Sequence, residues 1–193
     1  LADDPELAAG IAAARKLQYE FQLEWDELRK YANERGVRIV GDMPMYVSAD
    51  SSDVWSEQDI FNLDSDGHAA MQAGAPADQL SAEGQLWGNP TYDWDALRSD
   101  GYDWWLRRLD RAFKLYDYVR LDHFIGFSSY YQIEAGKPAT EGEYAFGPGA
   151  NLFVAANKLF GGLPLIAEDL GNVTPAVRAL VAETGVPGMS VVQ

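Results

Sequence analysis

The sequence contains no cysteine and few basic residues. Without cysteine the chain can form no disulfide bond and perform no thiolate chemistry, which suits a reducing compartment, so we expect a cytoplasmic protein. Lysine and arginine together number 15 against 30 aspartates and glutamates, and the formal net charge is −15. Nucleic-acid binding needs clustered basic side chains that neutralise phosphates, so this composition argues against a nucleic-acid partner. A neutral ligand such as a sugar would not be repelled.

Long apolar runs and clusters of metal ligands are also missing from the sequence. No apolar stretch approaches the roughly 20 residues of a membrane-spanning helix, so we expect no membrane partner. The two histidines, His68 and His123, lie far apart in the chain and no further metal-ligand pattern accompanies them. We therefore expect neither a metal nor a cofactor.

Four short apolar segments are predicted to be strands, and amphipathic patterns between them predict helices. The strands are residues 37–40, 118–122, 163–168 and 189–192. Helical spacing is found around residues 105–113 and 152–160, and a further helix is predicted from Pro175, with Thr174 as its N-cap, to Gly185. Before the first strand, one apolar stripe of a helix is formed by Leu17, Phe21, Trp25, Leu28 and Ala32.

This alternation of helix and strand favours the α/β class with a parallel sheet. The predicted strands end in acidic or polar residues, which is typical of a (β/α)8 (TIM) barrel, where chemistry takes place at the carboxyl ends of the strands. A doubly wound sheet is the competing architecture, but no Gly-rich phosphate-binding loop follows any of these strands. Four strands are about half of the eight that close a barrel. We therefore predict a partial TIM barrel.

The two chain ends and two long insertions complete this prediction. The sequence begins with Leu1 and stops at Gln193 directly after an apolar run. We therefore expect residues 1–193 to be the central part of a catalytic barrel whose start and end are missing. Residues 44–100, rich in Gly, Pro, Asp and Ser, and residues 130–149, with a hairpin-like pattern, are expected to be insertions on the barrel rim.

Two carboxylates stand out by their position at strand ends. Because side chains alternate along a strand, Arg120 and Asp122 share one face, while Val119 and Leu121 share the face that suits contact with helices. By the same parity Glu168 lies at the mouth of the next strand. Neighbouring strands are about 4.8 Å apart, close to the ~5–5.5 Å carboxylate separation of retaining glycosidases and below the roughly 6.5–9.5 Å of inverting ones. The pattern favours a retaining pair if the two strands are neighbours.

The pair would divide the chemistry between a nucleophile and a general acid/base. Asp122 must be ionised to attack an anomeric carbon, and Arg120 beside it would favour that form. Glu168 must hold a proton, which requires surroundings that raise its pKa. The alternative is that Arg120 and Asp122 form a plain structural ion pair and that Glu168 is a solvated strand end.

Aromatic residues are abundant in the first insertion. Sugar rings present apolar C–H faces that stack on aromatic planes, so these residues are candidate ligand contacts, although packing of the loop onto the barrel is the alternative for each of them. Trp87, which lies among Gly84, Gly88 and Asn89, is the best candidate. His123 is either a core histidine or a partner for a sugar hydroxyl. The aromatic residues of this insertion include Tyr46, Trp55, Trp87, Tyr92 and Trp94.

Several segments together resemble the 4-α-glucanotransferases (amylomaltases or disproportionating enzymes) of the α-amylase superfamily. The resemblance runs from about Leu17 to the last residue, with the segments in the family's order. They are YANERG (31–36), GDMPMYV (41–47), GQLWGNP (84–90), VRLDHF (119–124), GPG (147–149) and IAEDLG (166–171).

This resemblance implies an activity and assigns roles to residues. The enzyme would transfer α-1,4-glucan segments between maltooligosaccharides through a covalent glycosyl intermediate on Asp122, with Glu168 as acid/base and Arg120 supporting the nucleophile. By resemblance, Asp42 and Trp87 contact the glucan, and residues 73–78 arch over the cleft, loosened by Ala77 in place of a family proline. The full set of candidate substrate-contacting or supporting residues is Arg120, Asp42, Trp87, His123, Tyr46 and Asn89.

Two alternatives remain open, and the chain by itself is expected to be inactive. A retaining hydrolase of the same superfamily would use the same carboxylates with water as acceptor, and a non-catalytic glucan-binding relative would use neither. The family's third catalytic acid is expected beyond Gln193. We therefore expect that these 193 residues alone do not turn over glucan.

Overall fold

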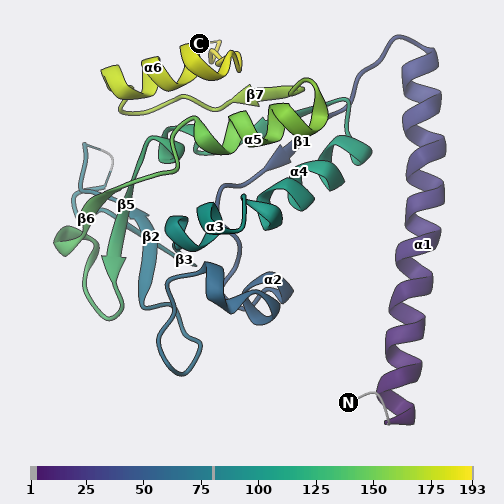
Figure 1. Ribbon diagram of the computed structural model, residues 1–193, viewed down its shortest axis with the longest axis horizontal. Helices are drawn as coiled ribbons and strands as arrows, with labels where there is room; N and C mark the ends of the chain where they lie inside the picture. Colours follow the sequence, from purple (N-terminus) through teal and green to yellow (C-terminus); the bar gives the residue numbers. More distant parts are fainter. Residues whose placement is uncertain (1–3, 80, 193) are drawn as a thin grey trace.

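The computed structural model describes residues 4–79 and 81–192 and contains two β-sheets flanked by helices (Figure 1). The strands are β1 (Val40–Met43), β2 (Met71–Ala75), β3 (Gln85–Pro90), β4 (Tyr118–Leu121), β5 (Ser129–Glu134), β6 (Glu143–Phe146) and β7 (Leu165–Ala167). The α-helices are α1 (Pro5–Glu34), α2 (Ser52–Ser56), α3 (Trp94–Ser99), α4 (Asp103–Leu115), α5 (Asn151–Phe160) and α6 (Pro175–Thr184). Short 3-10 helices are η1 (Gln58–Ile60), η2 (Phe124–Phe127) and η3 (Ala139–Glu141).

The first sheet is parallel, with the strand order β1-β4-β7. Asp42 pairs with Arg120 across β1 and β4, and Leu121 pairs with Ala167 across β4 and β7. The carboxyl ends of the three strands therefore lie side by side, which confirms the prediction that the strands carrying Asp122 and Glu168 are neighbours.

Helices cover one face of this parallel sheet. Val119 and Leu121 of β4 are fully buried, as are Leu165 and Ala167 of β7, in one cluster with apolar residues of α4 and α5. Arg120 on the opposite face stays partly accessible. The predicted alternation along these strands is confirmed. This alternation explains why the apolar strands β4 and β7 can be followed by charged residues, since only one face of each strand is buried.

Two of the predicted strands are wrong in part or in full. The first strand begins at Val40 rather than at Val37, because the Ile39 N–H donates a hydrogen bond to the Asp117 carboxylate instead of to a neighbouring strand. Within the strand, the Tyr116 ring packs onto Gly41, where no Cβ would fit. Residues 189–192 form no strand, and only Gly188 makes a parallel bridge to Ala167. Val192, at the end of this segment, is 96% exposed.

The second sheet is antiparallel, with the order β3-β2-β5-β6. The predicted hairpin within residues 130–149 is present as β5 and β6. The sequence did not predict that β5 also pairs with β2, so that strands from the two segments predicted to be insertions form one sheet. A buried aromatic cluster beneath it includes Tyr92, Trp94, Trp104, Trp105 and Phe127.

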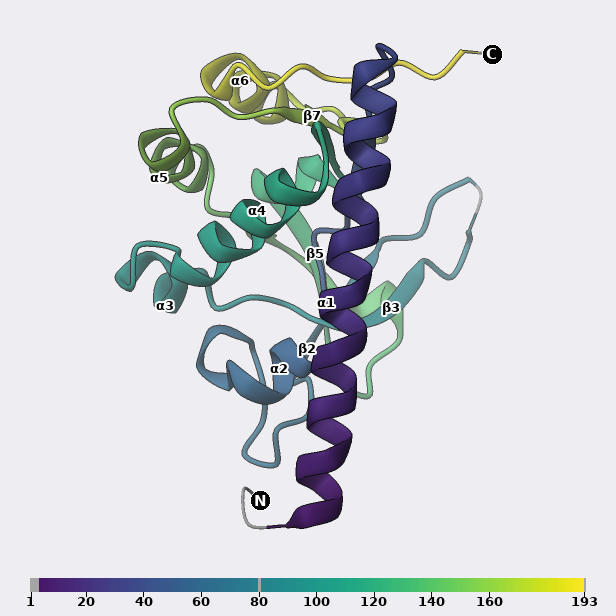
Figure 2. The same ribbon diagram turned by 90° about the vertical axis from the view of Figure 1, so that its right-hand side faces the viewer.

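Helix α1 stands apart from the rest of the chain over most of its length (Figures 1 and 2). Asp4 caps its first turn, and none of its residues is buried. Leu17, Phe21 and Leu28 of the predicted apolar stripe are about half exposed or more, and Trp25 is the larger of the two members of the stripe that are partly covered. The predicted stripe is therefore present on the helix but largely exposed within the described residues. In that part of the chain no helix combines the length and apolar character needed to cross a bilayer.

The C-terminal third of α1 is joined to the parallel sheet through Asp117, at the start of β4. Its carboxylate accepts hydrogen bonds from the Ile39 N–H (2.8 Å), from Asn33 Nδ2 (2.8 Å) and from the Arg29 guanidinium (2.9 Å). Burial raises the pKa of Asp117, but these hydrogen bonds more than offset it and lower the pKa to about 2. The ionised carboxylate thus ties α1, β1 and β4 together at the end of the sheet opposite to Asp122.

Replacing Asp117 by Asn is expected to lower the free energy of unfolding by about 2 kcal/mol at pH 7. Because the folded-state pKa lies below the unfolded value, the ionised carboxylate stabilises the fold above about pH 4. This contribution is lost as the pH falls towards about 2. Urea unfolding at pH 7 and pH 3 measures it. The control is Asp110→Asn, which removes an exposed i,i+4 pair with Lys114 and should cost at most about 0.5 kcal/mol. Equal losses in the two variants would contradict the role of Asp117.

Candidate active site

Arg120 joins two carboxylates at the carboxyl ends of β1 and β4. Its Nη1 atom lies 2.6 Å from Asp42 Oδ1 and its Nη2 atom 2.9 Å from Asp122 Oδ1. The sequence predicted the contact with Asp122 but not the one with Asp42, although the parallel register that pairs Asp42 with Arg120 accounts for it. The arginine is partly buried, with its side chain 27% exposed. A fixed positive charge therefore lies directly beside the Asp122 carboxylate.

Glu168 follows β7 and is hydrogen-bonded to the residues at the end of β4 and just after it. Its Oε2 atom accepts a hydrogen bond from the His123 N–H (2.9 Å), and its backbone carbonyl accepts one from the Phe124 N–H (3.0 Å). Its own N–H donates to the Leu121 carbonyl. The residue after each of two paired strands is thus an acid, which places Asp122 and Glu168 next to each other.

Opposing influences act on the protonation of Glu168. Partial burial raises its pKa and is the largest effect; the nearby charge of Asp122 also raises it. The His123 N–H and the positive charge of Arg120 lower it, and the balance is a raised pKa. The surroundings of Glu168 thus raise its pKa, which is the direction that a general acid requires.

His123 turns the chain sharply between the two acids. Its backbone is left-handed, with φ of 54°, and its ring meets Trp87 edge-on at a centroid distance of 5.1 Å. Gly126 packs so closely against His123 and Met45 that a Cβ would collide with both. The Nε2 atom of His123 is buried and has no hydrogen-bond partner among the described residues, and burial lowers its pKa. The His123 ring therefore lines the site, while its unpartnered Nε2 atom is buried on the side of Gly126.

A cavity of about 360 Å³ lies between these residues. Six of the eight residues predicted from the sequence line it. Arg120 and Asp42 do not, and lie beside it through their ion pairs with each other and with Asp122. The lining residues are Pro44, Met45, Tyr46, Trp87, Asn89, Asp122, His123 and Glu168.

The aromatic candidates divide into two groups. Tyr46 and Trp87 line the cavity, with their ring centroids 6.2 Å apart, and Trp87 is 38% exposed. Tyr92 and Trp94 are core residues, as the alternative interpretation held. Trp55 borders a different hollow near α2. Only Tyr46 and Trp87 of this set are therefore placed to meet a ligand between the two acids.

A second hollow of about 490 Å³ adjoins the first and shares Trp87, His123 and Glu168 with it. Gly74–Asp78, from the end of β2 and the loop after it, form part of its wall. Tyr130, Tyr144 and Asn172 also line it, and the sequence did not single them out. These residues come from the second sheet and from the loop after β7, so only the pairing of the two insertions could have indicated them.

The arrangement has the parts of an acid–nucleophile pair and lacks an obvious metal site. Two carboxyl groups meet at one cavity, one beside a guanidinium and one with a raised pKa. Such a pair can attack a carbon centre and protonate its leaving group. Within residues 4–79 and 81–192 there is no cluster of three or more acidic or histidine side chains that could hold a metal ion.

Comparisons with known proteins identify relatives of this chain. The sequence is 49% identical over 189 residues to the 4-alpha-glucanotransferase of Streptococcus pneumoniae serotype 4, and 44% identical over 188 residues to that of Thermus thermophilus. Each match covers 97% of this chain but only 37% and 38% of the relative. The amylomaltase of Streptococcus agalactiae in complex with acarbose superimposes with a TM-score of 0.93 at 44% identity, over 97% of this chain and 38% of that one. The 4-alpha-glucanotransferase family also matches residues 2–193, and the chain belongs to that family.

Proposed function

We propose that residues 1–193 form the central part of a (β/α)8 catalytic barrel that transfers α-1,4-glucan segments between maltooligosaccharides. The proposal rests chiefly on Asp122 and Glu168, which follow paired parallel strands and line one cavity. Strands in chain order with helices on a single face favour a barrel over a doubly wound sheet, which carries helices on both faces. Segments 44–100 and 130–149 would be its rim insertions. The name shared by the relatives supports the transferase activity.

The proposed reaction is a double displacement with retention. The Asp122 carboxylate attacks the anomeric carbon of a donor glucan, and the bond from that carbon to the glycosidic oxygen breaks as Glu168 protonates this oxygen. The 4-hydroxyl of a second glucan then gives its proton to Glu168 and attacks the same carbon, which releases Asp122. Arg120 would hold Asp122 in place. Tyr46, Trp87, His123 and Asn89 would form the walls around the sugar, and Asp42 would fix Arg120.

A retaining hydrolase is the alternative that uses the same residues, with water in place of the second glucan. The second hollow beside Glu168 favours transfer, because it offers space and aromatic side chains for an acceptor sugar next to the acid/base. A non-catalytic glucan-binding protein would need neither acid. The cytoplasmic location stays a prediction from composition.

Maltotriose separates these functions. A full-length protein containing these residues is expected to convert maltotriose into glucose and longer maltooligosaccharides at a constant number of reducing ends. Hydrolysis would raise the number of reducing ends, and a binding protein would leave maltotriose unchanged. The 193-residue chain is the control and should give no product, since its described part supplies three parallel strands where a barrel needs about eight. Robust turnover by this chain would contradict the proposed barrel.

A further inference from the structure

The segment that follows β1 forms one wall of the cavity without belonging to a strand. Met43 is the last residue of β1, and its carbonyl accepts the Asp122 N–H. Residues 44–47 then leave the sheet, yet Met45 and Tyr46 are buried. Backbone carbonyls in such a segment still need hydrogen-bond partners. The position of this wall therefore depends on what binds those carbonyls.

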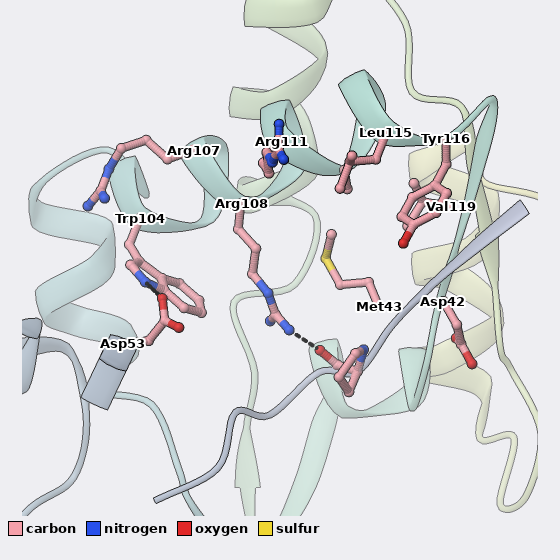
Figure 3. Close-up of a pocket in the computed structure, with 12 residues that line it drawn as sticks. Asp42, Met43, Asp53, Trp104, Arg107, Arg108, Arg111, Leu115, Tyr116 and Val119 are labelled. Carbon is pink, nitrogen blue, oxygen red and sulfur yellow. Dashed lines mark hydrogen bonds between the residues drawn. The ribbon is translucent and has the colours of Figure 1, made fainter. Parts of the chain in front are cut away.

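Side chains supply these partners. Arg108 of α4 donates from Nη2 to the Pro44 carbonyl (2.8 Å) and from Nη1 to the Met45 carbonyl (3.2 Å). Tyr92 also donates to the Met45 carbonyl (2.7 Å), and Asn89 Nδ2 donates to the Val47 carbonyl (2.8 Å). Figure 3 shows Arg108 extending from α4 past Trp104 towards the chain beyond Met43. The guanidinium thus spans two consecutive carbonyls from the helical side of the sheet.

The surroundings of Arg108 hold its guanidinium in this position. It lies over the rings of Trp104 and Trp105, 5.3 and 5.1 Å from their centroids. No carboxylate forms an ion pair with it in the described part of the chain, whereas its neighbour Arg107 pairs with Glu57 and Asp103. In a chain with an excess of acids, this arginine is directed at backbone oxygens instead.

The segment held by Arg108 contacts the other groups of the site. The Tyr46 ring lies 6.2 Å from the rings of both Trp87 and His123 and lines the cavity with Asp122 and Glu168. Met45 packs on Gly126, in the turn that follows His123. A shift of residues 44–47 would therefore move one wall of the cavity relative to both acids.

We propose that Arg108 is a positioning residue that sets the place of residues 44–47 and hence the shape of the cavity. Arg108 does not itself line the cavity and acts through the backbone of Pro44 and Met45. Lysine cannot replace it fully, because an ammonium group lacks the planar fork that binds two carbonyls. The effect on catalysis rests on the proposed function, and the effect on the segment does not.

The experiment compares Arg108→Met, Arg108→Lys and Arg111→Met in a full-length protein containing these residues. Arg108 and Arg111 both line a further hollow between α4 and β1 (Figure 3). Arg111 makes no hydrogen bond or ion pair within the described residues. A mutation far from the reacting atoms that displaces the site by about 1 Å can lower the rate by about 100-fold. We expect kcat/KM to fall about 10- to 100-fold in Arg108→Met, less in Arg108→Lys, and less than about twofold in Arg111→Met.

Amide hydrogen exchange gives a readout independent of activity. Exchange at residues 45–47 should rise in Arg108→Met and stay unchanged in Arg111→Met, with β4 and β7 equally protected in both. A wild-type protein without glucan transfer would refute the proposed function, while exchange would still test the positioning role. That role is overturned if Arg108→Met leaves kcat/KM and exchange unchanged, or if exchange rises equally in β4 and β7. Should Arg108→Met not fold, Arg108→Lys decides between the same outcomes.

Discussion

Replacing Asp122 by Asn is expected to abolish glucan transfer, with a fall in kcat of at least about 10³-fold. The amide has nearly the same shape and can still place an oxygen beside Arg120, whose Nη2 atom lies 2.9 Å from Asp122 Oδ1, but it carries no charge and is a poor nucleophile. Because the proposed intermediate is an ester of Asp122, the substitution should also prevent covalent trapping. Mass spectrometry after incubation with a fluorinated glycosyl donor measures this directly.

The outcomes of this experiment separate catalysis from binding. Wild type should gain the mass of one glycosyl group, and a peptide map should place it on Asp122. Asp110→Asn, a change in an exposed pair on α4, should trap as wild type does. Asp122→Asn should trap nothing while still binding maltooligosaccharide. Trapping in this variant, or no trapping in wild type, would contradict the assignment of Asp122 as nucleophile.

Replacing Glu168 by Gln is expected to lower kcat with maltotriose by about 10²- to 10⁴-fold. Glutamine cannot donate the proton that the leaving glycosidic oxygen requires. A glycosyl fluoride, whose leaving group needs little protonation, should form the covalent intermediate in this variant at a rate much closer to that of wild type. Burst kinetics with the fluoride donor therefore isolate the acid step.

The pH dependence of wild type should follow the same residue. Glu168 must be protonated in the first step, so kcat/KM should fall as the pH rises through its pKa. Burial and the charge of Asp122 raise this pKa, which moves the fall towards neutral pH. In Glu168→Gln with the fluoride donor this fall should disappear. An unchanged alkaline limb in the variant would assign the acid role to another group.

The acids could be predicted from sequence because strand parity is a local property. Val119 and Leu121 had to face the helices, which left Arg120 and Asp122 on the other face. The same reasoning located Glu168 after β7. A pattern of alternating apolar residues fixes orientation within one strand, and the parallel register then brings neighbouring strand ends together.

The remaining features depend on contacts between distant segments. Nothing in residues 71–75 alone indicates that β2 pairs with β5, because antiparallel pairing is set by both strands and by the core beneath them. The first strand was placed three residues early because Asp117, from the chain before β4, binds the Ile39 N–H. The apolar stripe predicted on α1 is present, yet the described residues cover little of it. In the first two cases the deciding partner lies far away in sequence.

The hydrogen bond from the His123 N–H to Glu168 has a further consequence. A backbone amide can only donate, so it binds the ionised carboxylate more strongly than the carboxylic acid. It therefore opposes the burial that favours the protonated acid. In the proposed reaction the same carboxyl group gives up a proton in one half-cycle and recovers it in the next, and a group held too firmly in either state would stall at one of them. This balance would let Glu168 alternate between its two states without a change in backbone structure.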